Sequence, residues 1–290
     1  MNDAIYLNQI QKRRLTNGKW ILMAQSDAPI VVSDQTKKIL DTEILQPEQF
    51  NQSFIDDLYE NGFVRDGKLR SKPTTENRSH IWKFTRFILI GLGLVSSVIS
   101  LILLFKIDFP TGRALLPKGI IFYQAIIFDL GVAVLTTILH EFMHMIFSQN
   151  ISVTRLRLNF NKSVAKISMS DVWTWSLLGR FSAVTSGMFL DIFWLMCLSF
   201  LQIHLQNWMI SAAISVLALR ILWQLRVHKR CDGQLLLAMV TDDPFLREKM
   251  KKPLKFNLKI KLYSTIGHLV TLLIFIGWVI PIILRLLGWV

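Results

Sequence analysis

The stretch that decides the fold runs from Thr137 to Ser148 and reads Thr-Ile-Leu-His-Glu-Phe-Met-His-Met-Ile-Phe-Ser. It places His140, Glu141 and His144 in the spacing His-Glu-x-x-His inside a long apolar run. Positions i and i+4 of an α-helix project from one face, so two imidazoles in this spacing can reach one metal ion. Zinc suits two neutral imidazoles, and a neighbouring carboxylate can act as a general base toward water. The pattern predicts a catalytic metal site.

The composition around this stretch indicates a polytopic membrane protein. Apolar residues make up 52% of the chain, the mean hydropathy is +0.40, and several apolar runs approach or exceed the length that a helix needs to cross a bilayer. Ionisable side chains are expensive to place in a membrane, so a cluster of them within a span indicates function. Cys197 and Cys231 are far apart and predict no disulfide framework.

Charge is unevenly distributed along the chain. Residues 1–80 contain 11 Lys/Arg and 11 Asp/Glu, whereas residues 81–290 contain 22 against 9. The basic excess therefore flanks the apolar runs, as the positive-inside bias requires, and argues against a nucleic-acid partner. Because no apolar run lies near the N-terminus, we expect no cleavable signal peptide and a soluble first domain that stays on the side of synthesis.

The apolar runs predict about five transmembrane helices. The basic segments between them place the N-terminus and the metal motif at the cytoplasmic side of the plasma membrane, and the C-terminus outside. The predicted spans are Phe84–Phe105, Ile120–Phe147, one within Trp173–Ile203, one within Trp208–Leu225 and one within Leu262–Leu287.

A different pattern follows the metal motif. From Ile151 to Met169 polar and apolar residues alternate around a turn at Asn161-Lys162, which predicts an amphipathic β-hairpin at the membrane surface. Its strand edge can hold a substrate extended, or the hairpin can serve only as an interfacial anchor. Both roles remain open.

The N-terminal residues predict a small α+β domain of the winged-helix type over 1–70, followed by a linker over 71–83. An Asn-Gly turn within Thr16–Lys19 predicts a hairpin, and Ser33 can cap a short helix. A second helix is expected from near Pro47 until Gly62, and Asp66-Gly67 predicts a closing hairpin. The chain is thus expected to be mainly α-helical, with this domain and the amphipathic hairpin as its β-structure.

This N-terminal pattern resembles the small peptide-recognition domains of the coenzyme-PQQ-chaperone type. The resemblance lies in the apolar run Ile30-Val31-Val32 ending at Ser33, then Ile39-Leu40, then Phe54 to Val64. It implies binding of the leader of a ribosomally made, later modified peptide. A winged-helix scaffold without a peptide ligand fits the pattern equally well.

A catalytic zinc usually has three protein ligands, so one ligand remains to be found. Asp232, after the fourth predicted span, returns at the depth of the two histidines, whereas Asp191 lies mid-span and is its rival. Cys231 is either a bystander or a soft ligand. The other candidates are His80, His204, His228, which is a weaker rival, His268 and Asp129.

His140-Glu141-x-x-His144 near the end of a span, a hairpin after it, and Asp232-Gly233 after a later span together resemble the site-two protease family of intramembrane zinc metalloproteases. The match covers about residues 120–245 and is similar to the bacterial branch found beside peptide-modification genes. It implies that His140, His144 and Asp232 bind zinc and that Glu141 is the base. The family often has Asn and Pro eight and five residues before that Asp, where this chain has Gln224 and Val227.

The resemblance implies that residues 84–290 form a transmembrane metalloprotease domain. The expected function is zinc-dependent hydrolysis of a peptide bond, near the cytoplasmic face, in a peptide or membrane-anchored substrate. Maturation of a ribosomally made peptide and regulated cleavage of a membrane regulator are both open. The alternative from another class is a non-catalytic export or immunity protein with a structural metal. Expected partners are the substrate and membrane lipid, with no nucleic acid.

Overall fold

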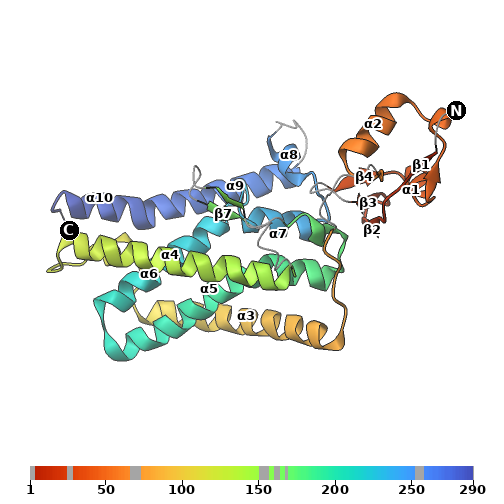
Figure 1. Cartoon of the computed structure of the whole chain (residues 1–290). Coiled ribbons are helices and arrows are strands. Elements are labelled where there is room, and N and C mark those ends of the chain that lie inside the picture. The colour runs from red at the N-terminus through yellow and green to blue at the C-terminus, as the bar shows by residue number, and fades with distance from the viewer. Residues whose placement is uncertain are drawn as a thin grey trace. The chain divides into compact units, whose positions relative to one another are not determined.

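The computed structural model describes residues 4–24, 29–65, 73–149, 157–159, 164–166, 169–251 and 258–289. The described chain is mainly helical, with small antiparallel sheets in its N-terminal part and one strand pair after the metal motif (Figure 1). It divides into two compact units, the first of residues 1–78 and 148–180, the second of residues 79–147 and 181–290. The predicted boundaries at residues 70 and 84 stay predictions.

The first unit is built on a three-stranded antiparallel sheet of β2 (Gln11–Arg14), β3 (Trp20–Met23) and β4 (Ile30–Val32). The predicted Asn-Gly turn joins β2 to β3, with Gly18 at φ 82°, a conformation that glycine adopts without steric cost. Two short strands, β1 (Ile5–Tyr6) and β5 (Ile44–Leu45), form a separate antiparallel pair. The hairpin prediction is confirmed, and the additional pair was not foreseen.

Two helices complete the N-terminal core. Helix α1 (Asp34–Leu40) begins where predicted, because the Ser33 side chain accepts a hydrogen bond from the Thr36 amide. Helix α2 (Gln52–Glu60) follows a 3₁₀ turn, η1 (Pro47–Gln49), and is capped by Asn51, so the expected helix start near Pro47 is wrong. Phe50 takes an extended conformation that separates the two. The buried core consists of Ile5, Leu7, Leu22, Ala24, Leu40, Leu45, Ile55, Leu58, Phe63 and Val64.

The predicted closing hairpin at Asp66-Gly67 and the predicted amphipathic hairpin are described only in part. Val64 forms an isolated antiparallel bridge with Leu7, while Asp66-Gly67 lies outside the described residues. Strands β6 (Arg157–Asn159) and β7 (Val164–Lys166) pair antiparallel as expected, and the turn at Asn161-Lys162 lies outside the described residues. A 3₁₀ turn, η5 (Asp171–Thr174), lies within the first unit's second segment, and its Thr174 hydroxyl donates to the Gln11 side chain at 2.8 Å. A winged-helix fold stays a prediction.

The second unit is a bundle of long apolar helices that run side by side (Figure 1). Four helices in the described part of the chain are long and apolar enough to cross a membrane, which indicates membrane association. They are α3 (His80–Lys106), α4 (Phe122–Phe147), α5 (Leu177–Leu205) and the continuous segment Leu258–Leu286, made of α9 (Leu258–Ile274), a π-helical turn η6 (Phe275–Val279) and α10 (Ile280–Leu286).

Shorter elements link these helices. The 3₁₀ turn η2 (Gly112–Leu115) precedes α4, and α7 (Asp232–Val240) and α8 (Leu246–Lys251) follow α6 (Trp208–Gln224). Helix α6 corresponds to the fourth predicted span but has 17 residues, about 26 Å of helix against a hydrocarbon core of about 30 Å. The count of five spans therefore stays a prediction. Leu104, Leu195, Ile214 and Leu217 form an apolar core between α3, α5 and α6.

Candidate metal centre

Helix α4 brings the two histidines of the motif together. His140 and His144 are 2% and 3% exposed, and their rings meet edge to face with centroids 4.6 Å apart. Their Nε2 atoms lie 3.0 Å from each other. The i, i+4 spacing therefore places the two imidazoles where both can reach one metal ion, as the sequence predicts, because both Nε2 atoms point to one place on the inner face of α4.

Asp232 joins them from α7. Its Oδ2 atom lies 3.0 Å from Nε2 of His140 and 3.5 Å from Nε2 of His144, and its side chain is 31% exposed. Within the described residues, one group of three or more metal-binding side chains is found, and it consists of these three. The structure thus brings the favoured third candidate to the two histidines.

The residues on either side of Asp232 explain how it reaches the site. A Cβ atom on Gly233 would clash with the carbonyl oxygen of Gln224, so only glycine lets the start of α7 lie against the end of α6. The Cys231 thiol donates a hydrogen bond to the same carbonyl at 2.9 Å. Burial raises the pKa of this thiol, which keeps its proton in place. Cys231 therefore anchors the segment and is not among the three clustered side chains.

Asp232 is held as a carboxylate. Burial by itself would raise its pKa, but the adjacent imidazoles of His140 and His144 outweigh burial, and the net pKa lies well below the ordinary value. Asp232 is therefore ionised at neutral pH and can act as an anionic ligand.

The outer nitrogens of both rings have fixed partners. Nδ1 of His140 lies 2.8 Å from Oδ2 of Asp191, and Nδ1 of His144 lies 2.8 Å from the carbonyl oxygen of Ala183. A carboxylate and a carbonyl only accept, so each Nδ1 must carry the proton and each Nε2 the lone pair. Two imidazole lone pairs and a carboxylate oxygen then converge on one point, a donor set that suits a divalent cation.

Asp191, the rival ligand, has a different place. It is 1% exposed, and its Oδ2 atom accepts hydrogen bonds from Nε of Arg220 at 3.0 Å and from Nε2 of Gln224 at 3.1 Å as well as from His140. Arg220 also donates to the hydroxyls of Thr136 and Thr137. Asp191 therefore orients His140 from behind. Gln224 takes the position where the site-two protease family, which the sequence resembles, often has Asn. Its side chain belongs to the hydrogen-bond network around Asp191.

Two residues of the site were missed from the sequence. A Cβ atom on Gly187 of α5 would lie 2.6 Å from Nε2 of His140, so glycine is needed for α5 to pass this close to the ring. No sequence signal distinguishes this glycine from others in the spans. Arg220 was overlooked although a lone arginine within an apolar run is itself a signal.

Glu141 is half-buried beside the cluster and within electrostatic range of His140, His144 and Asp232. Within the described residues no hydrogen bond or ion pair engages its carboxylate, in contrast to that of Asp191. His80, His204, His228, His268 and Asp129 lie outside the three-residue cluster. Comparison with models of protein families, with curated proteins and with solved structures finds no match to this chain.

Proposed function

We propose that this chain is an intramembrane zinc metallopeptidase that hydrolyses a peptide bond. The observation that carries the proposal is the convergence of Nε2 of His140, Nε2 of His144 and Oδ2 of Asp232, beside a glutamate that no described residue engages. Two histidines and one carboxylate are a common ligand set of catalytic zinc, and three protein ligands leave a fourth position open. The partly exposed Asp232 fits an open site better than a closed structural one.

Each residue has a separate role in this proposal. Zinc, when bound, would polarise the scissile carbonyl and lower the pKa of water toward 7. Glu141 takes the proton of the attacking water and passes it to the leaving amine. Asp191 holds the proton on Nδ1 of His140, which keeps Nε2 available and fixes the plane of the ring. The backbone of Ala183 does the same for His144.

The proposed substrate is a peptide or membrane-anchored segment cleaved at the cytoplasmic face of the plasma membrane. Basic residues cluster after α6, at Arg226, Lys229 and Arg230, on the side of the metal cluster, and this supports a cytoplasmic site. If the first unit binds a leader sequence, the product is a matured modified peptide. If it does not, the substrate is a membrane-bound regulator.

Metal content tests the ligand set. The full chain, purified in detergent, is expected to contain about one zinc ion per molecule. Asp232→Ala and His144→Ala should lose it. Asp243→Ala, which removes a carboxylate bonded to Lys249 on neighbouring α8, is the matched control and should keep it. Wild type without zinc, or metal retained by Asp232→Ala, would contradict the proposal.

Cleavage tests the base. Membranes that express wild type and Glu141→Gln are compared by mass spectrometry of new peptide N-termini. The variant should keep its zinc and produce at least about 100-fold less of the wild-type termini, because it loses a general base. Equal amounts of those termini from both proteins would refute the role of Glu141. Zinc retention without any wild-type-specific terminus would favour a non-catalytic export or immunity protein with a structural metal.

A further inference from the structure

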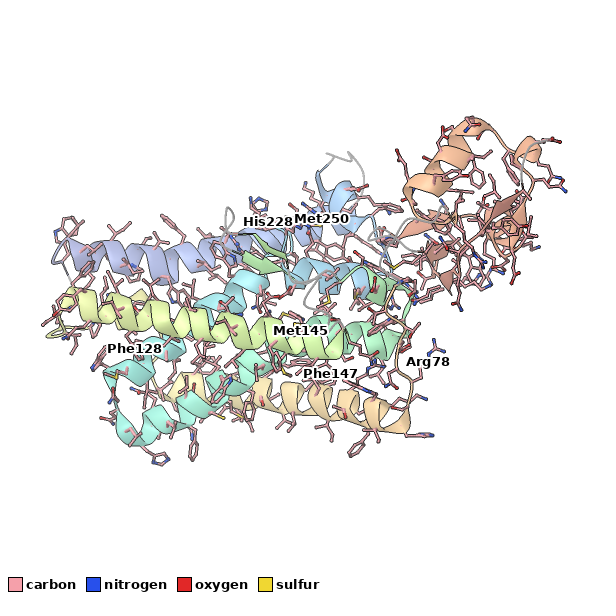
Figure 2. The ribbon with its side chains drawn as sticks, in the orientation of Figure 1. Arg78, Phe128, Met145, Phe147, His228 and Met250 are labelled. Atoms are coloured by element: carbon pink, nitrogen blue, oxygen red, sulfur yellow. The ribbon has the colours of Figure 1, made fainter. Side chains whose placement is uncertain are left out.

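A second polar site lies after α6, apart from the metal cluster. It is a cavity of about 300 Å³ between the segment that joins α6 to α7, the helix α7 and the helix α8. Figure 2 shows two of its lining residues, His228 and Met250, next to each other. The lining residues are His228, Lys229, Arg230, Gln234, Arg247 and Met250.

The cavity is strongly basic. Lys229, Arg230 and Arg247 supply three positive charges, and none of its lining residues is acidic. No ion pair joins these three side chains to a carboxylate in the described parts of the chain. Lys249, two residues from Arg247 on the same helix, is paired with Asp243 at 2.6 Å and does not line the cavity. Among the described residues, the three cavity side chains therefore have no carboxylate partner of the kind that Lys249 has in Asp243.

His228 is held rigidly in the wall. Its ring stacks on His268 of α9, with centroids 4.4 Å apart and an angle of 19° between the planes. A Cβ atom on Gly267 would clash with its Nδ1, so α9 is packed directly against the imidazole. Burial, and then the charges of His268, Lys229 and Arg226, lower the pKa of His228, which agrees with a positive local field. The site is thus partly preformed.

We propose that this cavity binds a phosphate group, and that the group is the headgroup of an anionic membrane lipid. Arg and Lys side chains are the usual partners of phosphate in proteins, and a basic pocket at the end of membrane helices suits an anionic lipid. The cavity lies directly after the end of the apolar helix α6. Helix α9, which carries the stacking partner of His228, also exposes the apolar side chains Leu262, Ile266 and Leu269. These side chains offer a surface for the acyl chains.

Thermal unfolding of the detergent-purified full chain tests this proposal without reference to catalysis. Dioleoylphosphatidylglycerol, dioleoylphosphatidylcholine and inorganic phosphate are titrated separately, and the midpoint temperature is followed by tryptophan fluorescence. A ligand that binds only the folded state raises this temperature. We expect phosphatidylglycerol to raise it and phosphatidylcholine to have no effect.

Variants locate the site. Arg247→Ala and, from the opposite wall, Lys229→Gln should raise the half-saturating concentration of phosphatidylglycerol at least about tenfold, since each removes a charged partner of the phosphate. Lys249→Ala removes a charge from the same helix outside the cavity and should stay within a factor of about two of wild type.

Other outcomes are equally decisive. Stabilisation by inorganic phosphate with the same dependence on Arg247 and Lys229, and none by the lipid, would keep the site and assign it to a soluble phosphate. No stabilisation by either ligand, or equal stabilisation of all variants, would overturn the proposal. Because the readout is unfolding, a failure of the proposed peptidase function leaves this result unaffected.

Discussion

The two compact units each contain an aspartate with charged partners, but one aspartate is partly exposed and the other is buried. In the first, Asp41 pairs with Lys12 at 2.6 Å and with Lys37, and its side chain keeps 29% of its surface exposed. In the second, Asp191 is 1% exposed and is bonded to His140, Arg220 and Gln224. Both carboxylates have charged partners, so the presence of such partners does not distinguish Asp41 from Asp191.

Burial does. An exposed ion pair replaces favourable contacts with water and contributes little to stability. A buried pair has already lost its water, so removing one partner leaves an uncompensated charge. We therefore expect Asp191 to matter far more to stability than Asp41. Variants of these two carboxylates test this difference, and a glycine variant beside His140 tests how closely the second unit is packed around its site.

The largest effect is expected for Asp191→Ala, which leaves Arg220, whose side chain is 16% exposed, without its carboxylate partner. Loss of one partner from a buried ion pair typically costs about 3–5 kcal/mol of unfolding free energy. The measurement is SDS-induced unfolding in mixed micelles. Metal affinity should fall as well, by about 10–100-fold, because the proton on Nδ1 of His140 loses its acceptor.

A double-mutant cycle provides the control for Asp191→Ala. Arg220→Ala and the double variant are unfolded under the same conditions. If the two side chains form one network, the double variant costs about 1–3 kcal/mol less than the sum of the single variants. Additive costs would show that Asp191 and Arg220 act independently.

An intermediate effect is expected for Gly187→Ala. The added methyl group meets Nε2 of His140 at 2.6 Å, so the ring or the helix must move, at a cost of about 1–3 kcal/mol and with weaker metal binding. Gly131→Ala in α4 has nothing within 4 Å of the new atom and should be neutral or slightly stabilising. The same response from both variants would mean that the contact with His140 is unimportant.

The smallest effect is expected for Asp41→Asn. Burial opposes ionisation of Asp41, but the bonds from Lys12 and Lys37 outweigh it and lower its pKa below 3.8. A lowered folded pKa stabilises the fold above the unfolded pKa, and this contribution disappears as the pH falls through the folded value. At pH 7 the variant should cost less than about 1 kcal/mol.

Hydrogen exchange of peptides from β2 and α1 in the full chain measures this last effect. The difference between Asp41→Asn and wild type, measured at the same pH for both proteins, should be small at pH 7 and should shrink as the pH falls below 3.8. Glu43→Gln removes a nearby charge that no described side chain engages, and should match wild type. A difference that persists at low pH would exclude the ion pairs as its cause.

Local signals in the sequence were sufficient where the structure depends on neighbours in the chain. The Asn17-Gly18 turn, the Ser33 cap and the spacing of His140 and His144 each act within a few residues, and each is confirmed in the structure. The start of α2 was misjudged because Pro47 and Asn51 are both good helix starts, and only the extended Phe50 between them decides.

Contacts between distant segments were harder to predict. Asp232 and Asp191 were both reasonable third ligands, because residue spacing does not say which of the later helices brings a carboxylate to Nε2 of His140. The close approach of Gly187 depends on how α5 crosses α4, which no single-sequence pattern encodes. Arg220 is the exception, since the cost of an intramembrane charge indicates a partner even when it does not say which one.

The separation of the ligands along the chain also has a consequence for biosynthesis. His144 is synthesised 88 residues before Asp232, on a helix that is complete before α7 is made. At about 5–20 residues per second, roughly 4 to 18 s pass before the third ligand leaves the ribosome. During that interval the nascent chain offers a metal only two imidazoles. At the proposed metal site, tight loading would therefore be a late event, and it would mark a chain whose translation has passed α6.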